Sequence, residues 1–113
     1  MKLLLAVVVL VALMGQGKSL QCYYCTNNPI SVGIPQDPNC GNTDYSTEDP
    51  SFIEEWSGFD GCLTRVYSDG KVERDGAFGN FDDGECDVGM FESTECFCHG
   101  DLCNIDLCEG CDA

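Results

Sequence analysis

The stretch that decides the fold is Cys96-Phe97-Cys98-His99-Gly100-Asp101-Leu102-Cys103-Asn104. Its three cysteines belong to a set of ten in a chain of 113 residues. The other seven are Cys22, Cys25, Cys40, Cys62, Cys86, Cys108 and Cys111. An even number of cysteines in a short exported chain indicates a framework of disulfides. The sequence therefore predicts one small domain held together by these bridges.

An export signal precedes the cysteines. Residues 1–19 begin with Lys2, continue with an apolar run at 3–14 and end in a stretch of mainly small residues, which is the order of a secretory signal peptide. Cleavage is expected after Ser19, or alternatively after Gly17. The apolar run of about twelve residues is too short to cross a bilayer, and no apolar tail of the kind that precedes a lipid anchor follows Asn104. We therefore expect a secreted, extracellular protein without a membrane anchor.

The composition explains why disulfides would be needed. Residues 20–113 hold 3 basic and 20 acidic side chains, hence a balance of −17. Leu, Ile, Val and Phe are also scarce there, so hydrophobic burial alone would stabilise a fold only weakly. Each disulfide typically adds roughly 2–4 kcal/mol. The negative charge repels nucleic acids and anionic membrane surfaces, and it favours a partner with a basic surface.

Turn-forming residues divide the chain into short extended pieces. Four of these pieces are expected to form strands, at residues 21–26, 62–68, 71–74 and 90–98. The middle two make a hairpin, because Asp69-Gly70 favours a type I′ turn between them. In this hairpin Val72 is expected to lie opposite Tyr67.

The segment 44–61 is the least typical part of the chain. Its large apolar side chains are Phe52, Ile53, Trp56 and Phe59. They would share one side of a short helical turn and pack against the sheet. The alternative is an exposed aromatic patch for a partner, since tryptophan is frequent at binding hot spots.

Three segments of the chain resemble the three-finger domains of the urokinase-receptor and lymphocyte-antigen family, also called LU or UPAR-like domains. The segments are residues 20–25, 58–63 and 96–104. The resemblance covers about residues 20–104. It implies a flat, all-β, disulfide-rich domain in which three hairpin fingers extend from a cysteine-rich palm, and it implies no catalytic centre.

The same resemblance implies how the cysteines pair. The implied bridges are Cys22–Cys62, Cys25–Cys40, Cys86–Cys96 and Cys98–Cys103. Asn104 would occupy the family's terminal asparagine position, where the side chain ties the chain end to the palm. The Asp69-Gly70 hairpin would be the central finger. One customary bridge at the base of that finger is missing, because the residues near Glu55 and Asp75 are not cysteines.

Residues 105–113 form an acidic tail that the family pattern does not explain. Its two cysteines, Cys108 and Cys111, could pair with each other, attach the tail to the domain, or link two chains. A pairing within the tail is expected. The protein would then be a monomer, and a covalent dimer through either cysteine is the alternative.

Catalytic, redox and metal chemistry are not expected. His99 is the only histidine and lies in a tight cysteine loop, where a surface role is more common than that of a positioned base. Acidic neighbours of Cys108 and Cys111 disfavour a reactive thiolate. The residues considered for calcium are Asp82, Asp83, Glu85 and Asp87. Their spacing is not that of an EF-hand, so a solvated acidic loop is expected. The sequence therefore predicts no enzyme and no cofactor.

The expected function, implied by the resemblance, is non-catalytic binding that modulates a receptor, an ion channel or another extracellular protein. The partner would carry a basic surface. The expected contact residues are Tyr67, Asp69 and Lys71 on the central finger, together with Trp56. One alternative is an acidic secreted calcium-buffering or matrix-type protein. Another is a toxin-like ligand, for which Lys71 and Arg74 would supply the positive charge.

Overall fold

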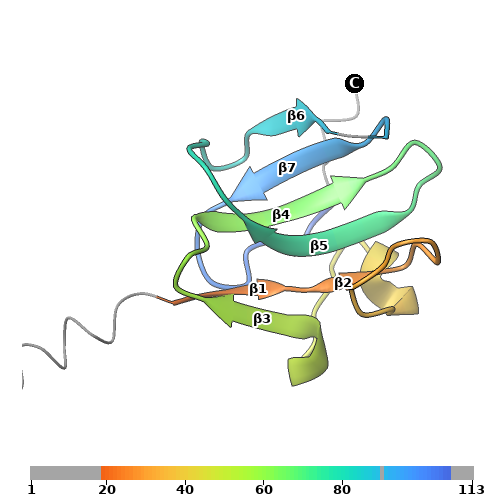
Figure 1. Ribbon diagram of the computed structural model, residues 1–113, viewed down its shortest axis with the longest axis horizontal. Helices are drawn as coiled ribbons and strands as arrows, with labels where there is room; N and C mark the ends of the chain where they lie inside the picture. The colour runs from red at the N-terminus through yellow and green to blue at the C-terminus, as the bar shows by residue number, and fades with distance from the viewer. Residues whose placement is uncertain (1–18, 90, 108–113) are drawn as a thin grey trace, which may run out of the picture.

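The computed structural model describes residues 19–89 and 91–107, and it shows a small, disulfide-rich, all-β fold (Figure 1). The strands are β1 (Leu20–Tyr23), β2 (Cys25–Thr26), β3 (Ile53–Trp56), β4 (Gly61–Val66), β5 (Val72–Ala77), β6 (Cys86–Val88) and β7 (Thr94–Cys98). Two short 3₁₀ turns are η1 (Pro38–Gly41) and η2 (Pro50–Phe52). The predicted all-β class is confirmed. Residues 1–18 of the predicted signal peptide 1–19 and the predicted pairing of Cys108 with Cys111 lie outside the described residues.

The strands form two antiparallel sheets. The smaller sheet pairs β1 with β3, and the larger has the order β2-β5-β4-β7-β6. The extended piece predicted at 21–26 is therefore divided at Tyr24, so that β1 joins one sheet and β2 joins the other. At this point the backbone N–H of Tyr24 donates to the carbonyl of Phe52 at 2.8 Å. One short segment thus connects both sheets, as Figure 1 shows.

The predicted β4–β5 hairpin forms, but its predicted turn and register are wrong. Val72 lies opposite Val66, and the N–H of Tyr67 donates to the carbonyl of Lys71 at 2.8 Å. The loop therefore has three residues. A type I′ turn needs a positive φ at Asp69 as well as at Gly70, whereas only Gly70, at 88°, has one. Asp69 instead accepts the Lys71 N–H at 3.0 Å, which fixes a turn with one extra residue at the glycine.

The segment 44–61 also differs from the prediction. Only residues 50–52 form a helical turn, and β3 follows directly, paired with β1 from Tyr23↔Ile53 to Leu20↔Trp56. The four apolar side chains of the segment therefore do not share one helical side. Pro50 explains the short turn, since its fixed φ starts a helix while the β-branched Ile53 and the aromatic Trp56 favour a strand.

The last predicted strand is shorter than expected. It begins at Thr94, because Phe91 and Glu92 both have φ of 57° and form a turn. A strand that was not predicted, β6, precedes this turn and pairs with β7. The turn and β6 were missed because the acidic residues around Asp87 gave no hydrophobic alternation.

Four disulfides join the pairs that the family resemblance implied, namely Cys22–Cys62, Cys25–Cys40, Cys86–Cys96 and Cys98–Cys103. Two of them lie inside the core. Cys25 and Cys40 pack with Tyr23 and Tyr45, and Cys22 and Cys62 pack with Phe59. A third cluster contains Leu63, Ala77 and Phe81. The hydrophobic core is thus three small groups, and cystine sulfur fills a large part of two of them.

Asn104 closes the space between the two sheets. Its side-chain oxygen accepts the N–H of Tyr23 at 3.0 Å, and its side-chain nitrogen donates to the carbonyls of Tyr23 and Leu63, each at 3.0 Å. The amide group therefore bonds to β1 and β4 as a neighbouring strand would. This is the tie between the chain end and the cysteine-rich region that the resemblance implied for this residue.

The carboxylates of Glu54 and Asp75 lie near the two positions where the resemblance indicated a missing bridge. Burial raises the pKa of Asp75 to about 6 from 3.8; the hydrogen bond from the Gly76 N–H partly opposes this shift, and the nearby charge of Glu54 adds to it. A raised pKa means that the folded chain still holds a proton when the unfolded chain has lost its own. The contribution of Asp75 to the free energy of unfolding should therefore fall as pH rises from about 4 to about 6.

The substitution Asp75→Asn is expected to remove this penalty. It should raise the free energy of unfolding by about 1–3 kcal/mol at pH 7 and leave it nearly unchanged at pH 3.5, because Asp75 is then protonated in both states. Urea unfolding at the two pH values measures the difference. The control is Asp87→Asn, an exposed acid on β6. An equal gain at both pH values would contradict the assignment.

Candidate binding surfaces

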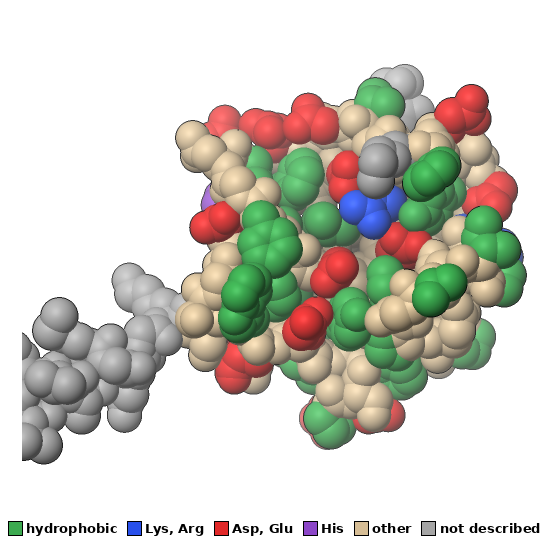
Figure 2. Space-filling model, viewed as in Figure 1, with side chains coloured by type: hydrophobic (Ala, Val, Ile, Leu, Met, Phe, Trp, Pro, Cys, Tyr) green, Lys and Arg blue, Asp and Glu red, His purple; other side chains and the backbone are tan. Residues whose placement is uncertain are grey.

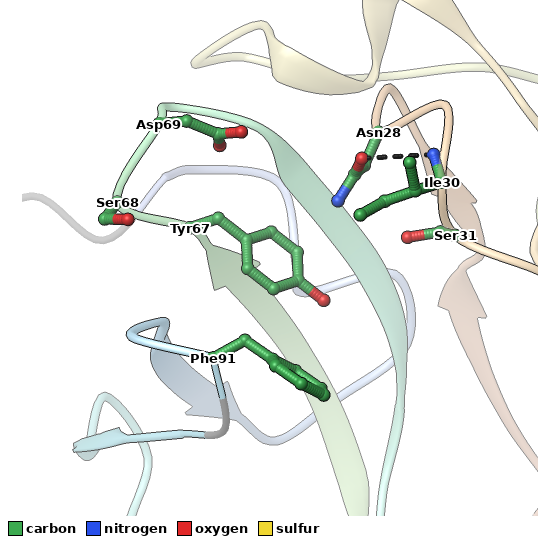
Figure 3. A pocket seen from close by; sticks show the side chains of 7 residues that line it. All are labelled: Asn28, Ile30, Ser31, Tyr67, Ser68, Asp69 and Phe91. Atoms are coloured by element: carbon green, nitrogen blue, oxygen red, sulfur yellow. Dashed lines mark hydrogen bonds between the residues drawn. The ribbon is translucent and has the colours of Figure 1, made fainter.

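Three loops meet at one end of the molecule and enclose a pocket, shown in Figure 3. They are residues 27–36, residues 67–71 and the turn after β6 (residues 89 and 91–93), and we call this end the loop end. The pocket has a volume of about 440 Å³. Its walls are formed by Asn28, Ile30, Ser31, Tyr67, Ser68, Asp69 and Phe91. Each of the three loops therefore contributes at least one side chain to the same space.

A network of hydrogen bonds beside the pocket joins the 27–36 loop to strands β4, β5 and β7. The buried carboxylate of Glu73 accepts bonds from the Ser31 hydroxyl and, at 2.8 Å, from the Arg65 guanidinium. Arg65 also donates to Glu95 on β7 at 2.6 Å. Burial and a hydrogen bond to Glu73 raise the pKa of Tyr67. The network therefore connects the 27–36 loop, the central hairpin and β7, and it holds the pocket walls in place.

The Arg65 side chain remains positively charged in this network. Burial by itself would lower the pKa of Arg65, but hydrogen bonds to Glu95 and Glu73 outweigh burial and raise it. Two carboxylates share one guanidinium. The network as a whole therefore keeps a negative charge below the pocket.

Large apolar side chains are exposed at the loop end. The exposed fractions are 82% for Ile30, 94% for Val32 and 81% for Phe91. Phe91 and Glu92 both have φ of 57° and lie in the turn between β6 and β7, where hairpins commonly use positive φ. Large apolar side chains exposed together at loop tips indicate a contact surface.

The structure brings together two of the four predicted contact residues. Tyr67 and Asp69 line the pocket, whereas Lys71 follows them in the same turn without lining it. Trp56 lies elsewhere. It pairs with Leu20 at the end of β3 and contacts Phe78, which follows the end of β5 away from the turn. The central hairpin therefore separates Trp56 from the loop end by the length of its strands.

Trp56 belongs to a second exposed group, the aromatic cluster Trp56, Phe59 and Phe78. Ring centroids in this cluster are 5.4–5.6 Å apart. Phe59 is buried, whereas Trp56 is 52% exposed and Phe78 is 61% exposed. A side chain at Gly76 would collide with the Phe59 ring, since its Cβ would lie 2.2 Å away. The prediction that the apolar side chains of 44–61 pack inside is therefore wrong for Trp56.

Sequence reasoning missed the apolar half of the loop-end pocket. Ile30 and Phe91 were not singled out, although each is a large apolar residue among turn-forming or acidic neighbours. Their positions in the sequence were the available signal, because an apolar side chain at the tip of a loop has no core to enter.

Figure 2 shows hydrophobic side chains at the surface among many acidic ones, with few basic side chains on this face.

His99, Asp83 and Glu85, which were considered for catalysis or calcium, make hydrogen bonds within the fold. Nε2 of His99 lies 2.9 Å from the carbonyl of Phe81, and the two rings stack. Asp83 accepts the backbone N–H of His99 at 2.9 Å, and Glu85 accepts that of Asp82 at 3.5 Å. Over residues 19–89 and 91–107, no group of three or more His, Cys, Asp or Glu side chains is arranged to hold a metal ion.

Comparison of the chain with protein-family models, curated proteins and solved structures found no match in any of the three. Within the described part of the chain, no helix is long and apolar enough to cross a membrane.

Proposed function

We propose that this chain is a secreted, non-catalytic binding protein of the three-finger type. It docks through the loop end onto an extracellular or membrane-receptor protein with a basic surface, and it modulates that protein by occupying it. In this proposal the three loops of the loop end (residues 27–36, residues 67–71, and residues 89 and 91–93) are the tips of the three fingers.

The observation that carries the proposal is the pocket shared by the three loops, with exposed Ile30 and Phe91 in its walls. Four disulfides support an extracellular location, because such bridges persist in oxidising compartments. The net charge of −15 supports a basic partner. The Glu73 network holds Ser31 and the central hairpin, so docking would cost little conformational entropy in these two loops.

The test compares two variants of the tagged, oxidised full-length chain. Ile30→Ser with Phe91→Ser removes the apolar loop end, and Val88→Ser is the control, since Val88 is 86% exposed on β6. Flow cytometry over a panel of cell types measures saturable binding to the cell surface. We expect the double variant to bind about tenfold more weakly or worse, as for loss of a hot-spot side chain.

The control should bind as the unaltered chain does, and added salt should weaken binding, because charge attracts the partner. Two results would contradict the proposal. One is saturable binding that the loop-end substitutions leave unchanged. The other is the absence of saturable binding on every cell type tested.

A further inference from the structure

We propose that the loop-end pocket receives an arginine side chain of the partner protein. The inference rests on the proposed function, because it names the chemistry that the loop end recognises. It is carried by the size and lining of the pocket, by the charges around it, and by the aromatic rings in its walls.

The pocket suits a long side chain with an apolar stem. Its volume of about 440 Å³ exceeds what a short side chain would fill, and Ile30, Tyr67 and Phe91 give it an apolar lining. Figure 3 shows these three side chains arranged around one space, with Asp69 at its edge. Arginine buries its methylene groups on apolar surface while its head group stays with polar partners.

The charges around the pocket favour a cation. Asp69 lines the pocket itself. Beneath it, Glu73 and Glu95 share Arg65, at 2.8 and 2.6 Å, so one of these two negative charges is not balanced. Arg74, the other arginine in the described part of the chain, is fully buried and does not reach this surface.

A guanidinium fits these groups better than other head groups do. It is flat and weakly hydrated, so it stacks on aromatic rings such as those of Tyr67 and Phe91. It also forms two parallel hydrogen bonds with one carboxylate, here that of Asp69. An ammonium is more strongly hydrated and would gain less from the rings. A purely apolar side chain would cover the Asp69 carboxylate and leave its charge without a counter-ion. The flanking charges of Lys71 and Glu92 cancel.

The experiment titrates the full-length, oxidised, isotope-labelled chain with N-acetyl-arginine-N-methylamide and follows its amide NMR signals. The matched probe is N-acetyl-citrulline-N-methylamide, which has nearly the same shape and no charge. We expect saturable shifts at Ile30, Tyr67, Asp69 and Phe91, and an affinity for the arginine probe about tenfold higher than for the citrulline probe, as for one charge-assisted pair.

Asp69→Asn should reduce the affinity for the arginine probe to that for the citrulline probe. The turn should survive, because asparagine retains the oxygen that accepts the Lys71 N–H. Asp87→Asn, which removes the same charge from β6, should leave the affinity unchanged. Equal affinity for both probes, shifts away from the loop end, or equal effects of the two substitutions would overturn the inference. If the arginine inference fails but cell binding still depends on Phe91, the proposed function stands. If cell binding does not depend on Phe91, the proposed function itself is refuted.

Discussion

Reduction of the disulfides is expected to unfold the domain completely. Two of the three core clusters contain cystine sulfur, and Cys22, Cys25, Cys40 and Cys62 are all fully buried. Cys22–Cys62 spans 40 residues and Cys25–Cys40 spans 15. At roughly 2–4 kcal/mol for each bridge, the four together match the whole stability of a typical small domain, about 5–15 kcal/mol.

Circular dichroism and amide NMR dispersion before and after reduction and alkylation measure this loss. Alkylating agent without reductant is the control and should change nothing. Removing the bridges one at a time should lower the stability by different amounts. The double substitution of Cys25 and Cys40 by Ser should cost more than that of Cys86 and Cys96, whose bridge spans only 10 residues and lies outside the three clusters. A reduced chain that retained its sheet signal and NMR dispersion would show that the hydrophobic clusters suffice.

The sequence predicted the parts of the fold that depend on local chemistry. The cysteine pattern and the scarcity of large apolar residues indicate a disulfide-dependent domain, and Asp69-Gly70 marks the central hairpin. The register of that hairpin was missed because a side-chain hydrogen bond in the turn decides it. Asp69 accepts the N–H of Lys71, and this single side-chain contact shifts Val72 from Tyr67 to Val66. The pattern of residue types alone does not distinguish a two-residue turn from a three-residue loop.

The candidate site was only half predictable, for a related reason. Tyr67 and Asp69 could be named from the hairpin, because turn residues are exposed in any fold. Ile30 and Phe91 are 61 residues apart in sequence. They line one pocket in a fold where contacts of Ser31, Glu73 and Arg65 tie the 27–36 loop to β5, β4 and β7. These polar contacts follow no periodic pattern.

Within residues 19–89 and 91–107 no carboxylate forms an ion pair with Arg74, which is nevertheless completely buried. Burial lowers the pKa of Arg74 to about 10, so the side chain remains charged at neutral pH. Its guanidinium donates to four backbone carbonyls, those of Cys40 at 3.1 Å, Asn42 at 2.6 Å, Asn104 at 2.8 Å and Ile105 at 2.8 Å. It also lies 4.9 Å from the centre of the Tyr45 ring. One side chain thus fixes two irregular segments on β5.

Arg74→Met is expected to lower the free energy of unfolding by about 3–5 kcal/mol, because four carbonyl oxygens lose their donor where water is excluded. Arg74→Lys keeps the charge but has too compact a head group to reach both segments, so about half of that loss should remain. Guanidinium unfolding with the bridges intact, followed by the fluorescence of Trp56, measures both. Lys71→Met removes a cation from the neighbouring turn and should cost less than about 0.5 kcal/mol. Faster amide exchange at Asn42 and Ile105, with β4 and β7 still protected, would locate the loss at the two segments. A stability of Arg74→Met within 1 kcal/mol of the unaltered chain would show that the carbonyls find other donors.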